Sequence, residues 1–564
     1  MTKPTKGTGA PGNGDGISRR ELAMVPVALG AVASTTASAQ PAFAVEDASL
    51  SDLQQALAEG RVSSSALTRA YLARIEAYDR NGPVLNSIRV TNPDALSIAA
   101  GLDGVKPSAQ RPLAGLPILV KDNIATGDRQ PTTAGSLALE GAHARDDAPV
   151  VKKLREAGAV ILGKANLTEF ANILAVGMPS GYSSIAGQVR NPYSPTLMDH
   201  HAPVVLPGGS SAGSAVTVAA GLCAAAIGTE TSGSLLSPAT QNGLVTVKPT
   251  VGLISRSGII PISHSQDTAG PMTRTVRDSA ILLNVLAARD PDDPATHLLQ
   301  RPEDYTAGLD KDGLKGARIG VPSDPDDPLN DPFYGPLSPR AKVVMARAIQ
   351  VLEDLGATIV RAAIPAIGWI GGPGTTMPVL NRNPFSPAKG TAGPASVVFL
   401  YELKRDLNLY LRDWATRTQM KTMADVIAFN TENADKALRY GQDLFLAAEQ
   451  TRGDLSELEY RSARAMDLMA AKDRGMDAYM NQHQLDAVVF PGASGSGIAA
   501  KPGYPSVQVP AGFISGVGKT DTPDYPLGLT FAGRAWSEAT LLRFAYAYEQ
   551  ATLARRPPPD LPAL

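Results

Sequence analysis

Two short loops hold the residues best suited to covalent chemistry. Residues 208–214 read GGSSAGS and residues 228–234 read GTETSGS, so both loops combine serines with glycines that let backbone approach a ligand closely. A serine hydroxyl becomes an effective nucleophile only beside a base. The histidines are scattered and none lies in a recognisable triad motif; they are at positions 143, 200, 201, 264, 297 and 483. The base must therefore come from another residue type.

Lys121 is the better candidate for that base. It lies near the end of GLPILVKDN (115–123), an apolar run typical of a buried strand. Burial of an ammonium group is costly, so such a lysine is either paired or has its pKa lowered until it is neutral. A neutral lysine can accept a proton from a serine.

The segments around these residues alternate between predicted helices and strands. Helices are expected at 53–59, 63–80, 148–157, 339–355, 396–416, 454–480 and 537–552, and strands at 115–121, 160–162, 317–321, 357–360 and 487–490. The segment 215–226 is apolar on nearly every face and predicts a helix buried on all sides. Repeated helix, glycine, strand units favour an α/β fold with helices on both faces of a sheet.

At this point the residues resemble a known family. The combination of ILVKDN with GGSSAGSA and GTETSGSLLSPA is similar to the amidase signature family of serine hydrolases, and most similar to its peptide-amidase-like branch. The likeness runs from about Leu50 to Pro559. It implies a central mixed twisted β-sheet flanked by helices. It also implies that Lys121 is the base, that Ser210 is a bridging serine in a cis peptide bond, and that Ser234 is the nucleophile.

The resemblance also implies a mechanism and an oxyanion hole. The interval of 24 positions from Ser210 to Ser234 agrees with the family's spacing, which argues against Ser211 as the bridge. Ser210 would relay a proton from Ser234 to Lys121, and Ser234 would form an acyl-enzyme that water hydrolyses. The backbone N–H groups that would hold the oxyanion belong to Thr231, Ser232 and Gly233.

The resemblance to the peptide-amidase-like branch implies hydrolysis of a carboxamide C–N bond. The expected substrates are C-terminal peptide amides or amino-acid amides. An aryl-acylamide or carbamate (urethane) is the second option for the same triad. The chain departs from the family's common residues at Ser232, Leu236 and Ala212. These departures keep open a third option, a non-catalytic binding protein or complex subunit with the amidase fold.

The composition and the residue spacing predict which classes of ligand this chain binds. The chain has 564 residues, 43% of them hydrophobic, and a net charge of −2, which predicts a large core and no nucleic-acid partner. No cluster of Cys, His or carboxylate residues has metal-ligand spacing, so neither a metal nor another cofactor is expected. The single cysteine, Cys223, is predicted to be a packed core thiol. The oligomeric state stays open.

GSSAG (209–213) also matches the nucleophile elbow of α/β hydrolases, with Ser211 as nucleophile. That alternative needs an acid and then a histidine downstream, such as His264 or His483. Nothing in the sequence around these histidines supports it, and His264 is more typical of a satisfied loop residue than of a base.

Residues 1–44 resemble a twin-arginine signal peptide. Ser18, Arg19 and Arg20 precede a weakly apolar run that is too short for a spanning helix, and AQPAFA ends at Ala44. We expect cleavage after Ala44, with Ala39 as second choice, and export to the periplasm or beyond, without stable membrane insertion. A disordered tail with a chance arginine pair is the alternative. The amidase domain would then span 45–564, with a catalytic core at about 50–290 and 483–555 and a variable, substrate-shaping region at about 290–482.

Overall fold

The computed structural model describes residues 43–195, 198–199, 202–203, 205–301, 304–323, 331–515 and 524–564. Residues 43–564 form one compact unit. The first 42 residues, which carry the arginine pair and most of the expected signal peptide, lie outside the described residues. The prediction of export therefore stays a prediction.

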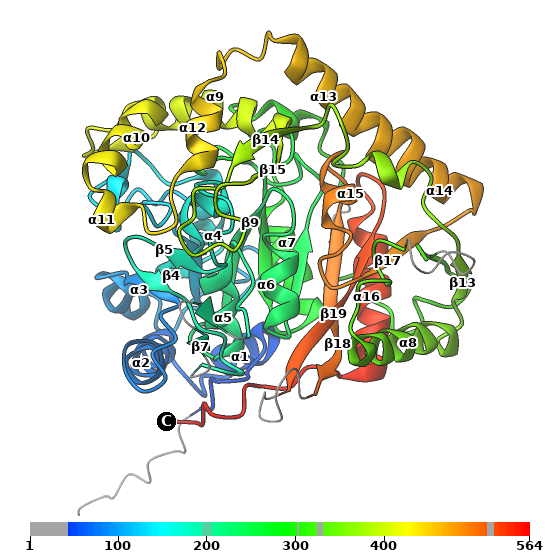
Figure 1. Cartoon of the computed structure of the whole chain (residues 1–564). Coiled ribbons are helices and arrows are strands. Elements are labelled where there is room, and N and C mark those ends of the chain that lie inside the picture. Colours follow the sequence, from blue (N-terminus) through cyan, green and yellow to red (C-terminus); the bar gives the residue numbers. More distant parts are fainter. Residues whose placement is uncertain are drawn as a thin grey trace, which may run out of the picture. The chain divides into compact units, whose positions relative to one another are not determined.

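The described chain is built on a mixed sheet of eleven strands (Figure 1). The strands are β1 (Ile88–Thr91), β2 (Pro117–Lys121), β4 (Val160–Ala165), β9 (Ala225–Glu230), β10 (Val245–Lys248), β11 (Thr268–Thr273), β12 (Arg318–Val321), β13 (Thr358–Arg361), β17 (Ala487–Pro491), β18 (Ser506–Ile514) and β19 (Tyr525–Ala532). Their order is β1-β4-β2-β9-β11-β10-β18-β19-β17-β12-β13. The runs β4-β2-β9 and β13-β12-β17 are parallel, and the other neighbours are antiparallel.

Helices flank this sheet, as the sequence predicts. They are α1 (Leu50–Ala58), α2 (Ser64–Arg74), α3 (Ala95–Gly101), α4 (Pro149–Glu156), α5 (Ala212–Ala219), α6 (Leu236–Gln241), α7 (Val276–Leu286), α8 (Pro339–Asp354), α15 (Ser496–Ala500) and α16 (Glu538–Thr552). α5 and α6 contact each other beside the central strands, and α4, α7, α16 and α8 pack against one another in series. Among the described residues, no helix is long and apolar enough to cross a lipid bilayer.

Local sequence signals explain where several of these helices begin. Ser338 caps α8 by accepting the N–H of Ala341, and Pro339 supplies a fixed φ at the first helical position. Ser63 caps α2 in the same way, and α2 continues into a π-helical segment, Ile75–Arg80. The predicted starts of both helices are confirmed.

The long buried helix predicted for 215–226 is wrong in its extent. α5 is fully buried but ends at Ala219, and the strand β9 has begun by Ala225. The reason is Gly221, whose φ of 67° is left-handed and turns the chain back toward the sheet. A Cβ at this position would lie 2.4 Å from the carbonyl oxygen of Glu46, so only glycine fits. Cys223 lies in the following turn and is buried, as predicted.

The region 290–482 has two structural parts. Its first part supplies the strands β12 and β13, which extend the main sheet, and the helix α8 between them. Its second part supplies the helices drawn in yellow to orange at the top of Figure 1, which we call the roof: α9 (Val397–Asp413), α10 (Met423–Glu432), α11 (Ala434–Ala437), α12 (Asp443–Glu449), α13 (Leu458–Leu468) and α14 (Asp477–Gln482). α9, α10 and α12 share an apolar cluster with the segment 170–178, which joins this part of the roof to the core.

Four two-stranded pairs complete the described structure. They are β3 (His143–Ala144) with β16 (Ala415–Thr416), β5 (Tyr182–Ser183) with β6 (Gly187–Gln188), β7 (Met198–Asp199) with β8 (Ala202–Pro203), and β14 (Thr376–Leu380) with β15 (Ala392–Ser396). The segment 512–520, GFISGVGKT, has the start of a phosphate-loop pattern, but β18 and β19 pair antiparallel up to Ile514 and Tyr525. Residues 512–514 thus belong to the antiparallel pair β18–β19, and the rest of the pattern from residue 516 lies outside the described residues.

Candidate active site

Lys121 is the last residue of β2, and its side chain is fully buried. Its Nζ lies 2.7 Å from Ser210 Oγ, 2.9 Å from Thr229 Oγ1 and 3.4 Å from the carbonyl oxygen of Thr229. Burial lowers the pKa of Lys121 to about 7, although the negative charges of Asp267 and Glu230 act in the opposite direction. A lysine with this pKa can take up and release a proton near neutral pH.

Ser210 is held at the start of α5 by contacts on both sides. Its side chain is fully buried, and the peptide bond that joins it to Gly209 is cis. Its carbonyl oxygen accepts the N–H of Thr168 at 3.0 Å. The N–H of the next residue, Ser211, donates to the carbonyl oxygen of Ser234 at 3.2 Å. This last bond joins the two serine loops and places the backbone of Ser234 next to Ser211, the residue that follows Ser210.

Ser234 lies in the turn between β9 and α6, and it is 8% exposed. The carboxylate of Glu230, at the end of β9, accepts the N–H groups of Leu235 at 2.8 Å and Leu236 at 3.1 Å. These are the two residues that follow Ser234. The turn is therefore closed by one buried acid, which also satisfies N–H groups that the first turn of α6 would leave without an acceptor.

The three residues before Ser234 present unused donors. The N–H groups of Thr231, Ser232 and Gly233 donate to no other residue that the structure describes. The rest of Thr231 is engaged, because its hydroxyl donates to Asp267 and its carbonyl oxygen accepts from Gln266 at 3.2 Å. Buried N–H groups are nearly always paired, so adjacent free donors in one turn indicate a place for an anionic oxygen. These are the groups that the sequence resemblance assigns to the oxyanion hole.

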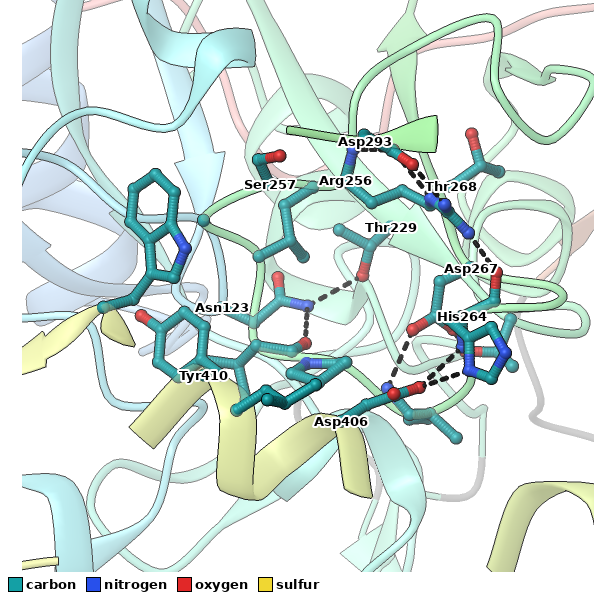
Figure 2. A pocket seen from close by; sticks show the side chains of 18 of the residues that line it. Asn123, Thr229, Arg256, Ser257, His264, Asp267, Thr268, Asp293, Asp406 and Tyr410 are labelled. Carbon is teal, nitrogen blue, oxygen red and sulfur yellow. Dashed lines mark hydrogen bonds and ion pairs between the residues drawn. The ribbon is translucent and has the colours of Figure 1, made fainter. Parts of the chain in front are cut away.

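A cavity of about 270 Å³ lies next to these residues, and Figure 2 shows the side chains of residues that line it. Asn123, Thr229 and Thr231 line it, and Asn123 Nδ2 donates to Thr229 Oγ1 at 3.0 Å. Its apolar lining comes from Ala171, Ile259, Ile260, Ile262, Leu409, Tyr410 and Trp414. Its charged lining includes Arg256, Asp293, His264, Arg405 and Asp406. The cavity therefore shares Thr229 with Lys121 and Thr231 with the free N–H groups.

The roof and the core meet at a cluster that the sequence spacing does not predict. His264 Nδ1 lies 2.8 Å from Asp406 and 3.5 Å from Glu402, both on α9. Burial lowers the pKa of His264, but the hydrogen bond to Asp406 and the charges of both carboxylates outweigh burial and raise it. The carboxylates also accept from Tyr460, from backbone N–H groups and, at 2.8 Å, from Arg405 Nη1. His264 is thus a partnered loop residue, as predicted.

Chelators test whether this cluster needs a metal. His264, Glu402 and Asp406 could present three ligand atoms within 4.8 Å of one another. Their oxygens already have N–H and O–H donors, and Arg405 supplies positive charge, so we expect EDTA to leave kcat/KM unchanged. A zinc peptidase treated in parallel is the control. Loss of activity that a divalent cation restores would contradict this expectation.

Sequence reasoning missed the contributions of Asn123, Thr229 and Glu230. All three lie inside the motifs KDN and GTETSGS, but the letters alone do not say what they contact. Asn123 and Thr229 form the hydrogen-bonded support of Lys121, and Glu230 closes the turn of Ser234. His483 is the other histidine that the nucleophile-elbow alternative could use. It caps the end of α14 and packs edge-on against Tyr479.

Comparison with known proteins identifies the family. The model of the family described as "Amidase" matches residues 66–542. The chain belongs to the amidase family. A probable amidase of Arabidopsis thaliana is 38% identical over 92% of both chains. The crystal structure of native peptide amidase from Stenotrophomonas maltophilia has a TM-score of 0.78 and 42% identity, and the match covers 91% of this chain and 98% of that one.

The amidase is also similar to one component of an amidotransferase. One subunit of the glutamyl-tRNA(Gln) amidotransferase of Chloroflexus aurantiacus is 34% identical over 88% of this chain and 95% of its own length. The family and the peptide-amidase neighbours establish that this amidase is a hydrolase of C–N amide bonds with the amidase-signature fold.

Proposed function

We propose that this amidase cleaves C-terminal peptide amides or amino-acid amides through Lys121, Ser210 and Ser234. The observation that carries the proposal is the 2.7 Å contact between Ser210 Oγ and the Nζ of a fully buried lysine with a pKa of about 7. A lysine in this state can act as a general base at neutral pH. The structural similarity to a peptide amidase supports the substrate class.

Thr229 orients the lysine for this role. A neutral amine has two N–H groups and one lone pair, and Thr229 offers two acceptors, Oγ1 and its carbonyl oxygen. When both N–H groups donate to Thr229, the lone pair points to the hydroxyl of Ser210. Asn123 donates to Thr229 Oγ1 and so fixes this acceptor in place.

The reaction then proceeds as two acyl transfers. Ser234 Oγ attacks the carboxamide carbon, and its proton moves through Ser210 to Lys121. The tetrahedral oxyanion accepts from the N–H groups of the turn 231–233. Lys121 returns the proton through Ser210 to the leaving nitrogen, and ammonia departs. Water then attacks the acyl carbon and gives a proton through Ser210 to Lys121, and Ser234 Oγ takes that proton back as the ester bond breaks and the acid leaves.

The cavity in Figure 2 suits the side chain next to the scissile carboxamide, because Thr229 and Thr231 line it together with several apolar residues. Burial of a leucine or phenylalanine side chain stabilises a complex by about 1.5–3 kcal/mol relative to glycine. We expect dipeptide amides ending in leucinamide or phenylalaninamide to exceed the glycinamide in kcat/KM by about 10- to 100-fold. Release of ammonia is the assay. Equal rates across the series would remove this cavity from substrate binding.

The first experiment is the intact mass of the protein after treatment with an active-site serine phosphonofluoridate. One adduct on the parent and none on Ser234→Ala would support the activated nucleophile. The parent enzyme would then be screened on peptide amides, aryl amides and carbamates. No adduct on the parent, at a concentration that labels a control hydrolase, would favour the non-catalytic alternative.

Export by the twin-arginine route is part of the same proposal. It is supported by Arg19 and Arg20 before the apolar run and by the small residues up to Ala44. Replacement of both arginines by lysine should retain the protein in the cytoplasm of a producing bacterium. Unchanged export of that variant would overturn the assignment.

A further inference from the structure

Glu230 is a buried acid that holds the turn of Ser234 in place. Its side chain is buried, and Oε2 accepts the N–H groups of Leu235 and Leu236. Leu235, which precedes α6, has no side-chain group that could cap the helix. The second oxygen, Oε1, makes no hydrogen bond to any residue that the structure describes. A carboxylate suits these N–H donors better than a neutral group, because a charged acceptor forms the stronger bond.

Lys248 is a buried cation on the same side of the sheet. It ends β10 and is fully buried, and its Nζ has no hydrogen-bond partner within the described residues. In the antiparallel register, Glu230 pairs with Thr268 of β11, and Thr246 pairs with Met272. Continued by two residues, this register places Lys248 opposite Gly270. Lys248 and Glu230 therefore share one face of the sheet.

That face is shaped to receive the turn. Gly228 and Gly270 lie between the two charged residues, and a Cβ on either glycine would come within 2.7 Å of the Leu235 side chain. Leu235 thus sits directly on the backbone of two strands, with Glu230 and Lys248 beside it. Burial lowers the pKa of Lys248 to about 8, and the negative charges of Glu230 and Glu538 oppose this. The Lys248 ammonium and the Glu230 carboxylate therefore attract each other.

We propose that Glu230, with Lys248 as its charge partner on the same face of the sheet, is the positioning residue that sets the oxyanion-binding N–H groups of the turn 231–233. An ordered water between Glu230 Oε1 and Lys248 Nζ would satisfy both unpaired atoms. The proposal rests on the proposed function, since it takes Ser234 as the nucleophile. Glu230 has no hydrogen bond to the side chains of Lys121, Ser210 or Ser234 among the described residues, so it acts through the turn and, by its charge, on the pKa of Lys121.

Other charged groups lie near Glu230 and Lys248, and their titration determines the pH at which variants of these two residues should be compared. They are Lys121 on β2, Asp267 before β11 and Glu538 on α16. Because the charge of Glu230 raises the pKa of Lys121, loss of that charge should move the acid limb of activity to lower pH. Measurements at pH 9, where Lys121 is neutral in parent and variant alike, isolate the effect on the turn.

Glu230→Gln keeps the size of the side chain and removes its charge. At pH 9 we expect kcat to fall about 10- to 100-fold, less than the loss of a whole oxyanion donor, with KM changed less than about threefold. The rate of phosphonofluoridate labelling should fall in parallel. The matched control is Glu538→Gln, since Glu538 also faces Lys248 but bonds the N–H of Thr250 at 2.7 Å. This control should keep parental kcat.

Lys248→Met removes the cation and keeps the length of the side chain. Without Lys248, the carboxylate of Glu230 lacks the positive charge that faces it, so we expect kcat at pH 7 to be about tenfold lower than parental. The double variant with Glu230→Gln should be no slower than Glu230→Gln alone at the same pH, because Lys248 acts through the charge of Glu230. Thermal unfolding of each variant confirms that it is folded, and a purely packing role of Lys248 would make the two losses add.

The outcomes separate this inference from the proposed function. Folded Glu230→Gln with parental kcat and labelling rate would overturn the inference, while the labelled parent would still support Ser234. Losses of Lys248→Met and Glu230→Gln that add in the double variant would overturn the role of Lys248. A parent that is never labelled would overturn the proposed function itself.

Discussion

Ser234→Ala is expected to abolish amide hydrolysis while the protein stays folded. Loss of a serine nucleophile lowers kcat by about 10⁴- to 10⁶-fold, because the remaining oxyanion donors and binding groups supply only residual catalysis. Ser234 is 8% exposed and its carbonyl oxygen, not its hydroxyl, joins the two serine loops. The substitution should therefore leave the unfolding midpoint unchanged. Ammonia release and circular dichroism measure the two effects.

Ser211→Ala is the matched control for this prediction. Ser211 is the centre of GSSAG, but its hydroxyl is fully buried and donates to the carbonyl oxygen of Thr229 at 3.0 Å. We expect this variant to retain labelling at Ser234 and to lose less than about tenfold in kcat, the size of one neutral hydrogen bond. If Ser211→Ala were dead and Ser234→Ala active, the nucleophile-elbow alternative would stand instead.

Lys121→Ala is expected to lower kcat/KM by about 10²- to 10⁴-fold at neutral pH, the range that a general base contributes. The sign of the pH dependence follows from the neutral amine being the active form. In the parent, kcat/KM should rise with pH up to the pKa of Lys121, about 7, and stay level above it. In Lys121→Ala this limb should disappear, and the residual rate should increase with pH as hydroxide replaces the base.

Lys164→Met provides the control for loss of a buried lysine. Lys164 lies on the neighbouring strand β4 and is fully buried, and burial lowers its pKa to about 8. Its Nζ donates to Thr132 Oγ1 at 2.9 Å and to the carbonyl oxygen of Ile124. The folded variant should keep the acid limb near pH 7. A parental profile for Lys121→Ala would remove Lys121 from catalysis.

Several elements could be predicted because their signals are local. Pro117–Lys121 is apolar up to its last residue, so its burial and the shift in the pKa of Lys121 follow from composition. α8 begins at a serine and proline pair and ends before Gly356. By contrast, the end of α5 depends on the approach of Glu46 to Gly221, a contact between residues far apart in the chain. Apolar residues continue past this point, so periodicity alone overextends the helix.

The sequence by itself determined the family, the class of reaction and the three candidate catalytic residues, because the motifs around Lys121, Ser210 and Ser234 are contiguous and characteristic. Only the tertiary structure decided what supports them. Thr229 and Asn123 hold the lysine, Glu230 holds the turn, and Lys248 shares the face of the sheet with Glu230. These roles depend on strand register and on burial, which arise when distant segments pack together and which no short motif encodes.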